Sequence, residues 1–234
     1  MHTGTVQDML RALSKVSLTD RPIDVVLTEI VHIAADGIPG AESTSITLIR
    51  GEKAYTAAYA GEMSLAADEL QYERGYGPCM DAARGNVVLR VDDMRTETRW
   101  PDYSPRVVDV GVRSSLSLPL PFQGSVIGAL NVYSSVPGAF RGEETMAAGI
   151  EVAEAVAVAV ANADGYAQVV DQAHNMRKAM ESRAVIEQAK GVLMAQRGID
   201  PQQAFDMLRE ASQRYNRKLR DIAAGIIAST QGRR

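Results

Sequence analysis

Three short apolar stripes follow one another between Arg183 and Ser229, and each has the spacing of one face of a helix. Gly198 ends the first segment. Asp200-Pro201 starts the second, because an Asp accepts the free N–H groups of a helix start and Pro tolerates the first helical position. Helices this short are not stable alone, so the stretch is predicted to be a three-helix bundle with one core. The residues expected in that core are Val185, Ile186, Ala189, Val192, Leu193, Met194, Ala204, Phe205, Leu208, Ala211, Leu219, Ile222, Ala223, Ile226 and Ile227.

The charge of the chain is unevenly distributed. Residues 176–234 contain 12 Lys and Arg against 6 Asp and Glu, whereas residues 1–175 contain 13 against 23. A basic patch in a small terminal domain is typical of a nucleic-acid partner. A solvated surface with a few ion pairs is an equally good interpretation of charge alone. The cations that gather around the second helix and the turn after it are Arg209, Arg214, Arg217, Lys218 and Arg220.

The residues within this bundle resemble the ANTAR family. The resemblance rests on Ala189-Lys190-Gly191 followed by Leu193-Met194, on Ala204-Phe205 with Leu208-Arg209, and on Leu219 with Ile222-Ala223. It covers nearly all of residues 184–229, and the spacing between the helices matches as well. The resemblance implies a three-helix module that binds tandem stem-loops in nascent leader transcripts and prevents a terminator from forming.

Two residues are the best candidates for RNA contact when the family pattern is carried over by position, namely Lys190 and Arg209. Arg217 and Lys218 are weaker candidates, and Arg214 belongs to the same basic cluster. A guanidinium both stacks on a base and donates hydrogen bonds to phosphate.

Tyr215 is an aromatic next to this cluster and is a candidate for stacking on an unpaired base, or it covers the edge of the core. Gly191 costs about 1 kcal/mol within a helix relative to Ala. A close approach by RNA or by another helix explains that cost, and a merely tolerated Gly is the alternative.

The chain before residue 142 is predicted to mix helices and mostly antiparallel strands. Alternation and β-branched residues indicate strands, with a hairpin at Gln123-Gly124-Ser125. Asp68 to Tyr72 is predicted as a short helix or a loop. The expected helices are residues 6–16, 23–38 and 106–110, and the expected strands are 43–49, 54–60, 87–91, 116–122 and 126–133.

This arrangement is similar to the GAF family of small-molecule sensor domains. The residues that carry the resemblance are Gly75-Tyr76-Gly77-Pro78-Cys79, Val91-Asp92-Asp93 and the strand pair 115–120 with 126–133. The resemblance implies an α+β sensor with an unknown small-molecule ligand, since the family binds cyclic nucleotides, haems, tetrapyrroles, small acids or nothing known. The sequence identifies neither the ligand nor a cofactor.

Cys79 is the only cysteine, so no internal disulfide forms. It precedes a predicted helix, where the helix dipole favours a thiolate, which makes it a candidate sensor switch; a small buried residue is the alternative. His2, His32 and His174 lie far apart, so no standard zinc site is expected. No paired carboxylates, catalytic triad or phosphate loop is found, and no enzymatic activity is expected.

Residues 142–181 form a predicted helical connector. The steps between its apolar residues alternate four and three, as in a coiled coil, and Arg177 interrupts them. This seam favours a homodimer; a helix that covers the sheet of its own chain is the alternative for its first half. The seam consists of Val152, Val156, Ala159, Ala163, Tyr166, Val170, Ala173, Met180 and Ala184.

The sequence therefore predicts a sensor domain at residues 1–141, a coiled-coil connector at 142–181 and an RNA-binding domain at 182–234. The chain lacks a signal-peptide pattern and a run of 18 apolar residues, which indicates a cytoplasmic protein without a membrane span. The predicted function is signal transduction to transcription antitermination. A DNA-binding factor of the helix-turn-helix type, with Asn216-Arg217-Lys218 as its turn, and a protein-interaction bundle remain alternatives.

Overall fold

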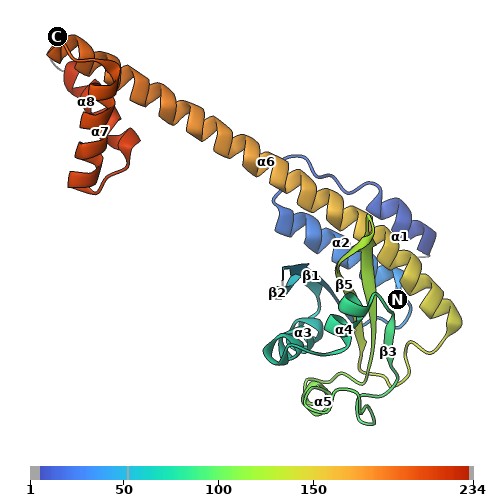
Figure 1. The fold of residues 1–234 in the computed structure, drawn as a ribbon. Coiled ribbons are helices and arrows are strands. Elements are labelled where there is room, and N and C mark those ends of the chain that lie inside the picture. Colours follow the sequence, from blue (N-terminus) through green and yellow to red (C-terminus); the bar gives the residue numbers. More distant parts are fainter. Residues whose placement is uncertain (1–5, 52, 232–234) are drawn as a thin grey trace. The chain divides into compact units, whose positions relative to one another are not determined.

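The protein folds into two compact units, of which the first ends at Ala167 and the second begins at Gln168. The computed structural model describes residues 6–51 and 53–231. The long helix α6 (Glu143–Arg197) contributes its first part to one unit and its second part to the other (Figure 1).

The first unit is an antiparallel sheet with helices on both faces, as the sequence predicts. The strand order is β2-β1-β5-β4-β3, and all four neighbouring pairs are antiparallel. Its elements before α6 are α1 (Val6–Leu13), α2 (Ile23–Gly37), β1 (Ser43–Arg50), β2 (Lys53–Ala60), α3 (Glu62–Arg74), α4 (Pro78–Gly85), β3 (Leu89–Val91), α5 (Ser104–Asp109), β4 (Ser114–Phe122) and β5 (Ser125–Ser134).

One face of the sheet is apolar and carries the main core. Successive side chains of a strand point to opposite faces, so Ile46, Leu118 and Leu130 lie together on this face. Helices α1, α2 and the first part of α6 cover it, and Val152 and Val156 of α6 are completely buried there. The first half of the predicted coiled-coil seam is thus part of the core of its own chain.

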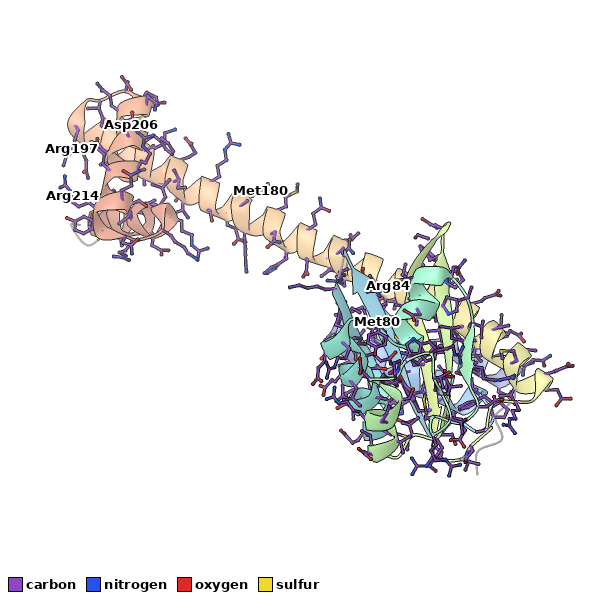
Figure 2. The ribbon with its side chains drawn as sticks, turned by 60° about the horizontal axis from the view of Figure 1, so that its bottom comes forward. Met80, Arg84, Met180, Arg197, Asp206 and Arg214 are labelled. Atoms are coloured by element: carbon purple, nitrogen blue, oxygen red, sulfur yellow. The ribbon has the colours of Figure 1, made fainter. Side chains whose placement is uncertain are left out.

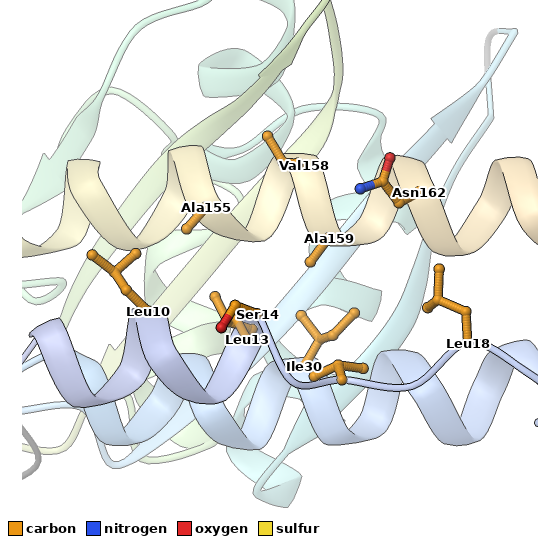
Figure 3. A pocket seen from close by; sticks show the side chains of 10 residues that line it. Leu10, Leu13, Ser14, Leu18, Ile30, Ala155, Val158, Ala159 and Asn162 are labelled. Atoms are coloured by element: carbon orange, nitrogen blue, oxygen red, sulfur yellow. The ribbon is translucent and has the colours of Figure 1, made fainter.

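An apolar groove of about 400 Å³ remains between α1, α2 and α6. Leu10 and Leu13 of α1 face Ala155 and Ala159 of α6 across it (Figure 3). Val158 is half exposed at the rim.

Helix α3 is the largest departure from the predicted elements of this unit. It runs over 13 residues, whereas the sequence indicates only a short helix or loop at 68–72. Its buried positions have ideal helical spacing but carry Ser64, Ala67, Asp68 and Gln71. Hydrophobic periodicity cannot detect a helix whose buried face is polar.

The second unit contains the end of α6, helix α7 (Pro201–Tyr215) and helix α8 (Leu219–Gln231). The predicted start of α7 is confirmed: the Asp200 carboxylate accepts from Gln203 N at 2.8 Å, and the Gln203 side chain accepts from Asp200 N at 3.1 Å. Ala189, Leu193, Ala204, Leu208 and Ala223 form the buried centre of the bundle.

Phe205 differs from the prediction that it belongs to this core. It is only half buried and lies outside the cluster of packed apolar residues. Because Phe205 and Arg209 are four residues apart on α7, their side chains lie on the same side of that helix.

Helix α6 is exposed at every residue from 169 to 181. The helix as a whole is long and apolar enough to cross a membrane by length and composition alone. However, Val152, Val156 and Val160 are completely buried in the core of the first unit, as in the core helix of a soluble domain.

We predict that Gly128→Ala destabilises the first unit. A Cβ at position 128 of β5 would overlap the carbonyl group of Thr47 in the neighbouring strand, where only backbone movement relieves the clash. The expected loss is about 2 kcal/mol or more of unfolding free energy. Trp100 is the only tryptophan and is buried in this unit, so urea unfolding followed by its fluorescence measures the change.

Gly165→Ala is the matched control, because a Cβ on that helical residue meets nothing within 4 Å. It is expected to change the unfolding free energy by less than about 1 kcal/mol, in the stabilising direction. Equal effects of the two substitutions would show that the β1–β5 contact does not limit position 128.

Candidate nucleic-acid interface and buried sensor site

The turn between α7 and α8 presents cations that have no ion-pair partner among the described residues. Arg214, Arg217 and Lys218 are exposed, and none forms an ion pair with any residue that the structure describes. The turn is short because Asn216 adopts a left-handed conformation, with φ of 48°, and ends α7. Arg214 lies beside the end of α7, away from the Asp206 end of that helix (Figure 2). These cations are therefore available to phosphate.

The two residues that the resemblance favours are more constrained. Lys190 has only 17% of its side chain exposed, and its Nζ lies 3.0 Å from the Glu187 carboxylate. Arg209 is 61% exposed and lies 3.3 Å from Asp206. Exposed pairs of this kind contribute little to stability, so Arg209 can exchange Asp206 for a phosphate at small cost. Contact between Lys190 and RNA requires release from Glu187.

Two aromatic side chains are accessible near these cations. Tyr215, at the end of α7, is 64% exposed and is not part of the core. Phe205, which sequence reasoning assigned to the core, is only partly buried and lies on the same side of α7 as Arg209. Because it is incompletely buried, Phe205 is a further candidate for base stacking. The sequence could not indicate this, because its helical spacing fits a core residue equally well. Gly191 is exposed, and a Cβ there meets no atom of the chain.

The first unit contains a second candidate site on the polar face of its sheet. The register aligns Ser45 of β1, Asn131 of β5 and Ser117 of β4 in one row across three strands. Tyr133 and Ser115 form the next row on the same face. All five are buried, under α3, α4 and α5. Buried polar groups require hydrogen-bond partners, so this face is organised by polar contacts.

A ring of hydrogen bonds centres on Asp68 of α3. The Tyr133 hydroxyl donates to Asp68 Oδ1 at 2.7 Å, and the Thr56 hydroxyl donates to Oδ2 at 2.9 Å. Gln71 Nε2 donates to the Tyr133 oxygen at 3.2 Å, and Gln71 Oε1 accepts from Cys79 N at 2.8 Å. The ring thereby ties α3 to β5, to β2 and to the start of α4.

Burial dominates the electrostatics of this ring. It raises the pKa of Asp68 from 3.8 to about 6, although hydrogen bonds from Tyr133 and other hydroxyls oppose the change. Burial also raises the pKa of Tyr133 well above its usual value. No cationic side chain bonds to Asp68 within the described part of the chain.

Cys79, the predicted sensor switch, lies inside this ring. Its Sγ contacts Thr47 Oγ1 at 3.2 Å and accepts from Asn131 Nδ2 at 3.1 Å. It stands in the first turn of α4, as expected, but it is completely buried. Burial and the charge of Asp68 raise the pKa of the thiol to about 12, so the thiolate that a helix start favours is suppressed.

Three polar atoms on this face have no hydrogen-bond partner among the described residues. They are Asn131 Oδ1, Ser115 Oγ and Ser117 Oγ. Neither they nor Asp68 stand out in the sequence, where they read as ordinary strand and helix residues. Among the described residues, no group of three or more His, Cys, Asp or Glu side chains is arranged to hold a metal ion.

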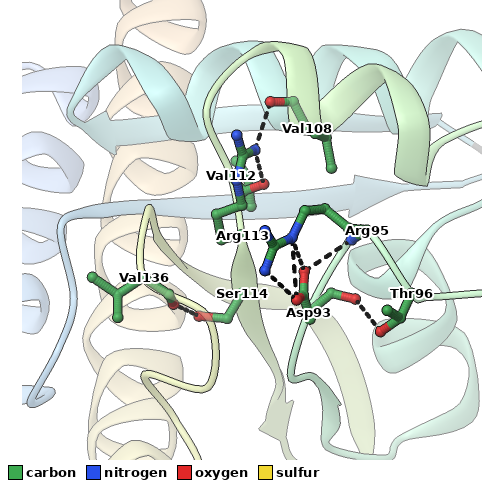
Figure 4. A network of polar contacts seen from close by, with 8 residues as sticks. All are labelled: Asp93, Arg95, Thr96, Val108, Val112, Arg113, Ser114 and Val136. Carbon is green, nitrogen blue, oxygen red and sulfur yellow. Dashed lines mark hydrogen bonds and ion pairs between the residues drawn. The ribbon is translucent and has the colours of Figure 1, made fainter.

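Residues 92–113, here called the covering segment, close the polar face from outside. Trp100 Nε1 donates to Asp81 of α4 at 2.7 Å, and Arg106 pairs with Glu73 of α3 at 2.8 Å. Arg95 forms two-pronged contacts with Asp93, which hold the pKa of Asp93 at about 2 (Figure 4). The segment is thus attached to α3 and α4 by side chains alone.

We predict an unusual pH dependence of stability for the first unit. The folded state raises the pKa of Asp68 from 3.8 to about 6, so folding favours the protonated carboxyl. The contribution of Asp68 to stability is therefore full below about pH 4 and is lost as the pH rises through about 6, by roughly 3 kcal/mol. Asp68→Asn is expected to abolish this part of the dependence.

Urea unfolding at pH 4.5 and pH 7, followed by Trp100 fluorescence, tests this prediction. Glu97 and Glu42 have lowered pKa values and oppose the trend, so the difference between the wild type and Asp68→Asn is the decisive quantity. Glu69→Gln, at an exposed neighbouring position, is the control. Parallel pH profiles for all three proteins would contradict the prediction.

Comparison with known families accounts for both units. Residues 20–161 match the GAF domain family, and residues 174–227 match the ANTAR domain family. Comparison with curated protein sequences gives no match.

Solved structures share the fold of the first unit. The chain is similar to the GAF domain of a phosphoenolpyruvate-protein phosphotransferase from Coxiella burnetii, with 18% identity over 70% of this chain and 98% of that chain and a TM-score of 0.51. It is also similar to the free methionine-R-sulfoxide reductase of Neisseria meningitidis in complex with its substrate, with 19% identity over 68% and 90% of the chains and a TM-score of 0.51. Identities this low establish the fold alone. The chain belongs to the GAF domain family and carries an ANTAR domain, an RNA-binding regulatory module, after its sensor domain.

Proposed function

We propose that this protein is a cytoplasmic, signal-responsive regulator that binds stem-loop RNA in nascent leader transcripts and prevents transcription termination. One observation carries the proposal: exposed Arg214, Arg217 and Lys218, without ion-pair partners among the described residues, cluster within the ANTAR match. ANTAR domains bind RNA, and cations without internal ion pairs need not break such a pair when they bind phosphate.

The sensor domain controls the output in this proposal and performs no catalysis. Its only thiol, Cys79, is completely buried and has a raised pKa, which opposes the thiolate that redox chemistry needs. The GAF fold is shared with reductases as well as with regulatory domains, so the fold alone does not decide between them.

A homodimer through α6 is part of the proposal. Every residue from 169 to 181 is exposed, and isolated helices of about this length are marginal in water. Val170 and Met180 are 47% and 68% exposed and belong to the apolar seam of the connector. A second copy of the chain would bury these side chains and stabilise the helix.

We predict that Arg214→Ala with Arg217→Ala weakens binding to a tandem stem-loop RNA by about tenfold or more, because two phosphate contacts are lost. The dependence of log K on log salt should become shallower by about 1 to 2. The purified full chain is titrated into labelled RNA at several salt concentrations. Lys178→Ala with Arg183→Ala removes equal charge from exposed positions of α6 outside the apolar seam and is expected to have a smaller effect.

Three further arms of this titration separate the alternatives. Lys190→Ala with Arg209→Ala tests the pair that the family resemblance favours, and Phe205→Ala with Tyr215→Ala tests base stacking. A loop-scrambled RNA and a DNA duplex test specificity. Equal binding to the DNA duplex would support a helix-turn-helix factor instead, and absence of any nucleic-acid binding would favour a protein-interaction bundle.

We predict that Val170→Glu with Met180→Glu converts a dimer to a monomer, because four carboxylates would meet in an apolar seam. Light scattering after size-exclusion chromatography measures the mass. Gln172→Glu with Asn175→Glu adds the same charge to the exposed helix outside the seam and should leave the dimer intact. A wild-type monomer, or equal dissociation by both pairs, would contradict this arrangement.

A further inference from the structure

The carboxylate of Asp68 is buried without a counter-charge. It is completely buried and receives hydrogen bonds only from neutral groups, the hydroxyls of Tyr133 and Thr56 and, at 3.4 Å, the amide of Asn131. The hydroxyls of Ser45 and Thr47 also act on it, so its partners are numerous but none of them is a cation. A buried charge without a partner is costly, and a ligand of opposite charge would remove that cost.

The surrounding polar atoms add neutral acceptors and hydroxyl groups but no positive charge. Asn131 uses its amide N–H groups toward Cys79, Thr47 and Ser45 and leaves Oδ1 without a donor among the described residues. Ser115 Oγ and Ser117 Oγ, on the neighbouring strand, are also without partners there. Each of the three residues is completely buried. The face therefore offers acceptors that are not filled by its own N–H donors, and it has no cationic donor.

Aromatic rings complete the environment. Trp100, Tyr103 and Tyr133 are buried in the apolar cluster that also contains Ala67, the neighbour of Asp68. Aromatic faces attract cations, most strongly where water is excluded. The ring of Trp100 already binds one cation, since the Arg99 guanidinium carbon lies 4.5 Å from its centroid.

We propose that the polar face around Asp68 binds a small organic ammonium ion, with Asp68 as the counter-charge, Asn131 Oδ1 and Ser117 Oγ as acceptors, and the aromatic cluster around it. This inference rests on the proposed sensor function and names the chemical class of its ligand. Because the face holds no Lys or Arg for a second charge, the ligand carries no carboxylate; free amino acids are excluded from the class.

Entry of the ligand requires movement of the covering segment. Its links to the helices beneath are the Trp100–Asp81 hydrogen bond, the Tyr76–Asp102 hydrogen bond at 3.0 Å and the Arg106–Glu73 ion pair. All three are contacts between side chains, and the last two are exposed to solvent. Uncovering Tyr103 and Asp68 also requires the apolar contacts of Trp100 and Tyr103 with Ala67 of α3 to open, but no strand pair has to break.

Matched amines and alcohols test the proposal on the full chain. Benzylamine and n-butylamine are compared with benzyl alcohol and n-butanol, which have the same shapes without the charge, and with 4-(aminomethyl)benzoate, which adds a carboxylate. At about ten times its Kd, an amine should raise the Tm of the sensor domain by about 3–5 °C, and the alcohols and the benzoate should not. Calorimetry then gives the affinity of the amine that binds.

Asp68→Asn should lower that affinity by tenfold or more, whereas the exposed control Glu69→Gln should leave it unchanged. An equal Tm increase in Asp68→Asn, an equal increase with the alcohols, or no increase with either amine overturns the proposal. A preparation that binds stem-loop RNA but no amine overturns this inference and leaves the proposed function standing. A preparation that binds an amine but no RNA overturns the proposed function and leaves this inference standing.

The wild type supplies a second measurement if Asp68→Asn does not fold. Affinity for benzylamine should fall about tenfold between pH 7.5 and pH 5, as Asp68 takes up a proton. The other titratable groups that face Asp68 are Tyr72 of α3, Cys79 of α4, Tyr103 before α5 and Tyr133 of β5, and raised pKa values keep all four neutral in this range. An affinity independent of pH overturns the proposal.

Discussion

The strict alternation of side chains along β1, β4 and β5 is the constraint on which the sensor domain depends. It sends Leu118 and Leu130 to one face and Ser117 and Asn131 to the other. The apolar face is covered by α1, α2 and α6 and supplies the burial that holds the domain together. The polar face is also buried, so its polar groups cannot bond to water. They therefore require hydrogen bonds from residues of α3 and α4. The main core and the candidate sensor site thus lie on opposite faces of one sheet.

Asp68 shows how this division creates a site. A carboxylate at the same depth on the apolar face would have no donors at all, whereas here it has hydroxyls and an amide but no cation. Its hydrogen bonds stabilise the carboxyl group enough for it to remain buried. No positive charge offsets the negative charge of its ionised form. The same burial keeps the Cys79 thiol protonated, because the low dielectric that raises the pKa of a carboxyl also disfavours a thiolate.

The second unit depends on a different balance. Its core is small, centred on Ala189, Leu193 and Leu208, and short helices of this kind share their stability. Small buried residues bring the helices close together and leave the long basic side chains outside. Phe205 and Tyr215 add apolar surface beside these cations, a combination that suits unpaired bases better than it suits water.

The sequence by itself determined the elements whose pattern is apolar: the strands of the sheet, α2, the capped start of α7 at Asp200, and the three-helix core, together with the family motifs. Tertiary structure alone decided the rest. Helix α3 hides its period because its buried face is polar, and Asp68, Asn131 and Ser117 become a site only when the register of β1, β5 and β4 aligns them. Packing likewise determined how exposed Phe205, Lys190 and Cys79 are. Their spacing along a helix is compatible with a buried position and with an exposed one. Periodicity reports which residues share a face, and only the partners of that face determine whether it is a core, a site or an interface.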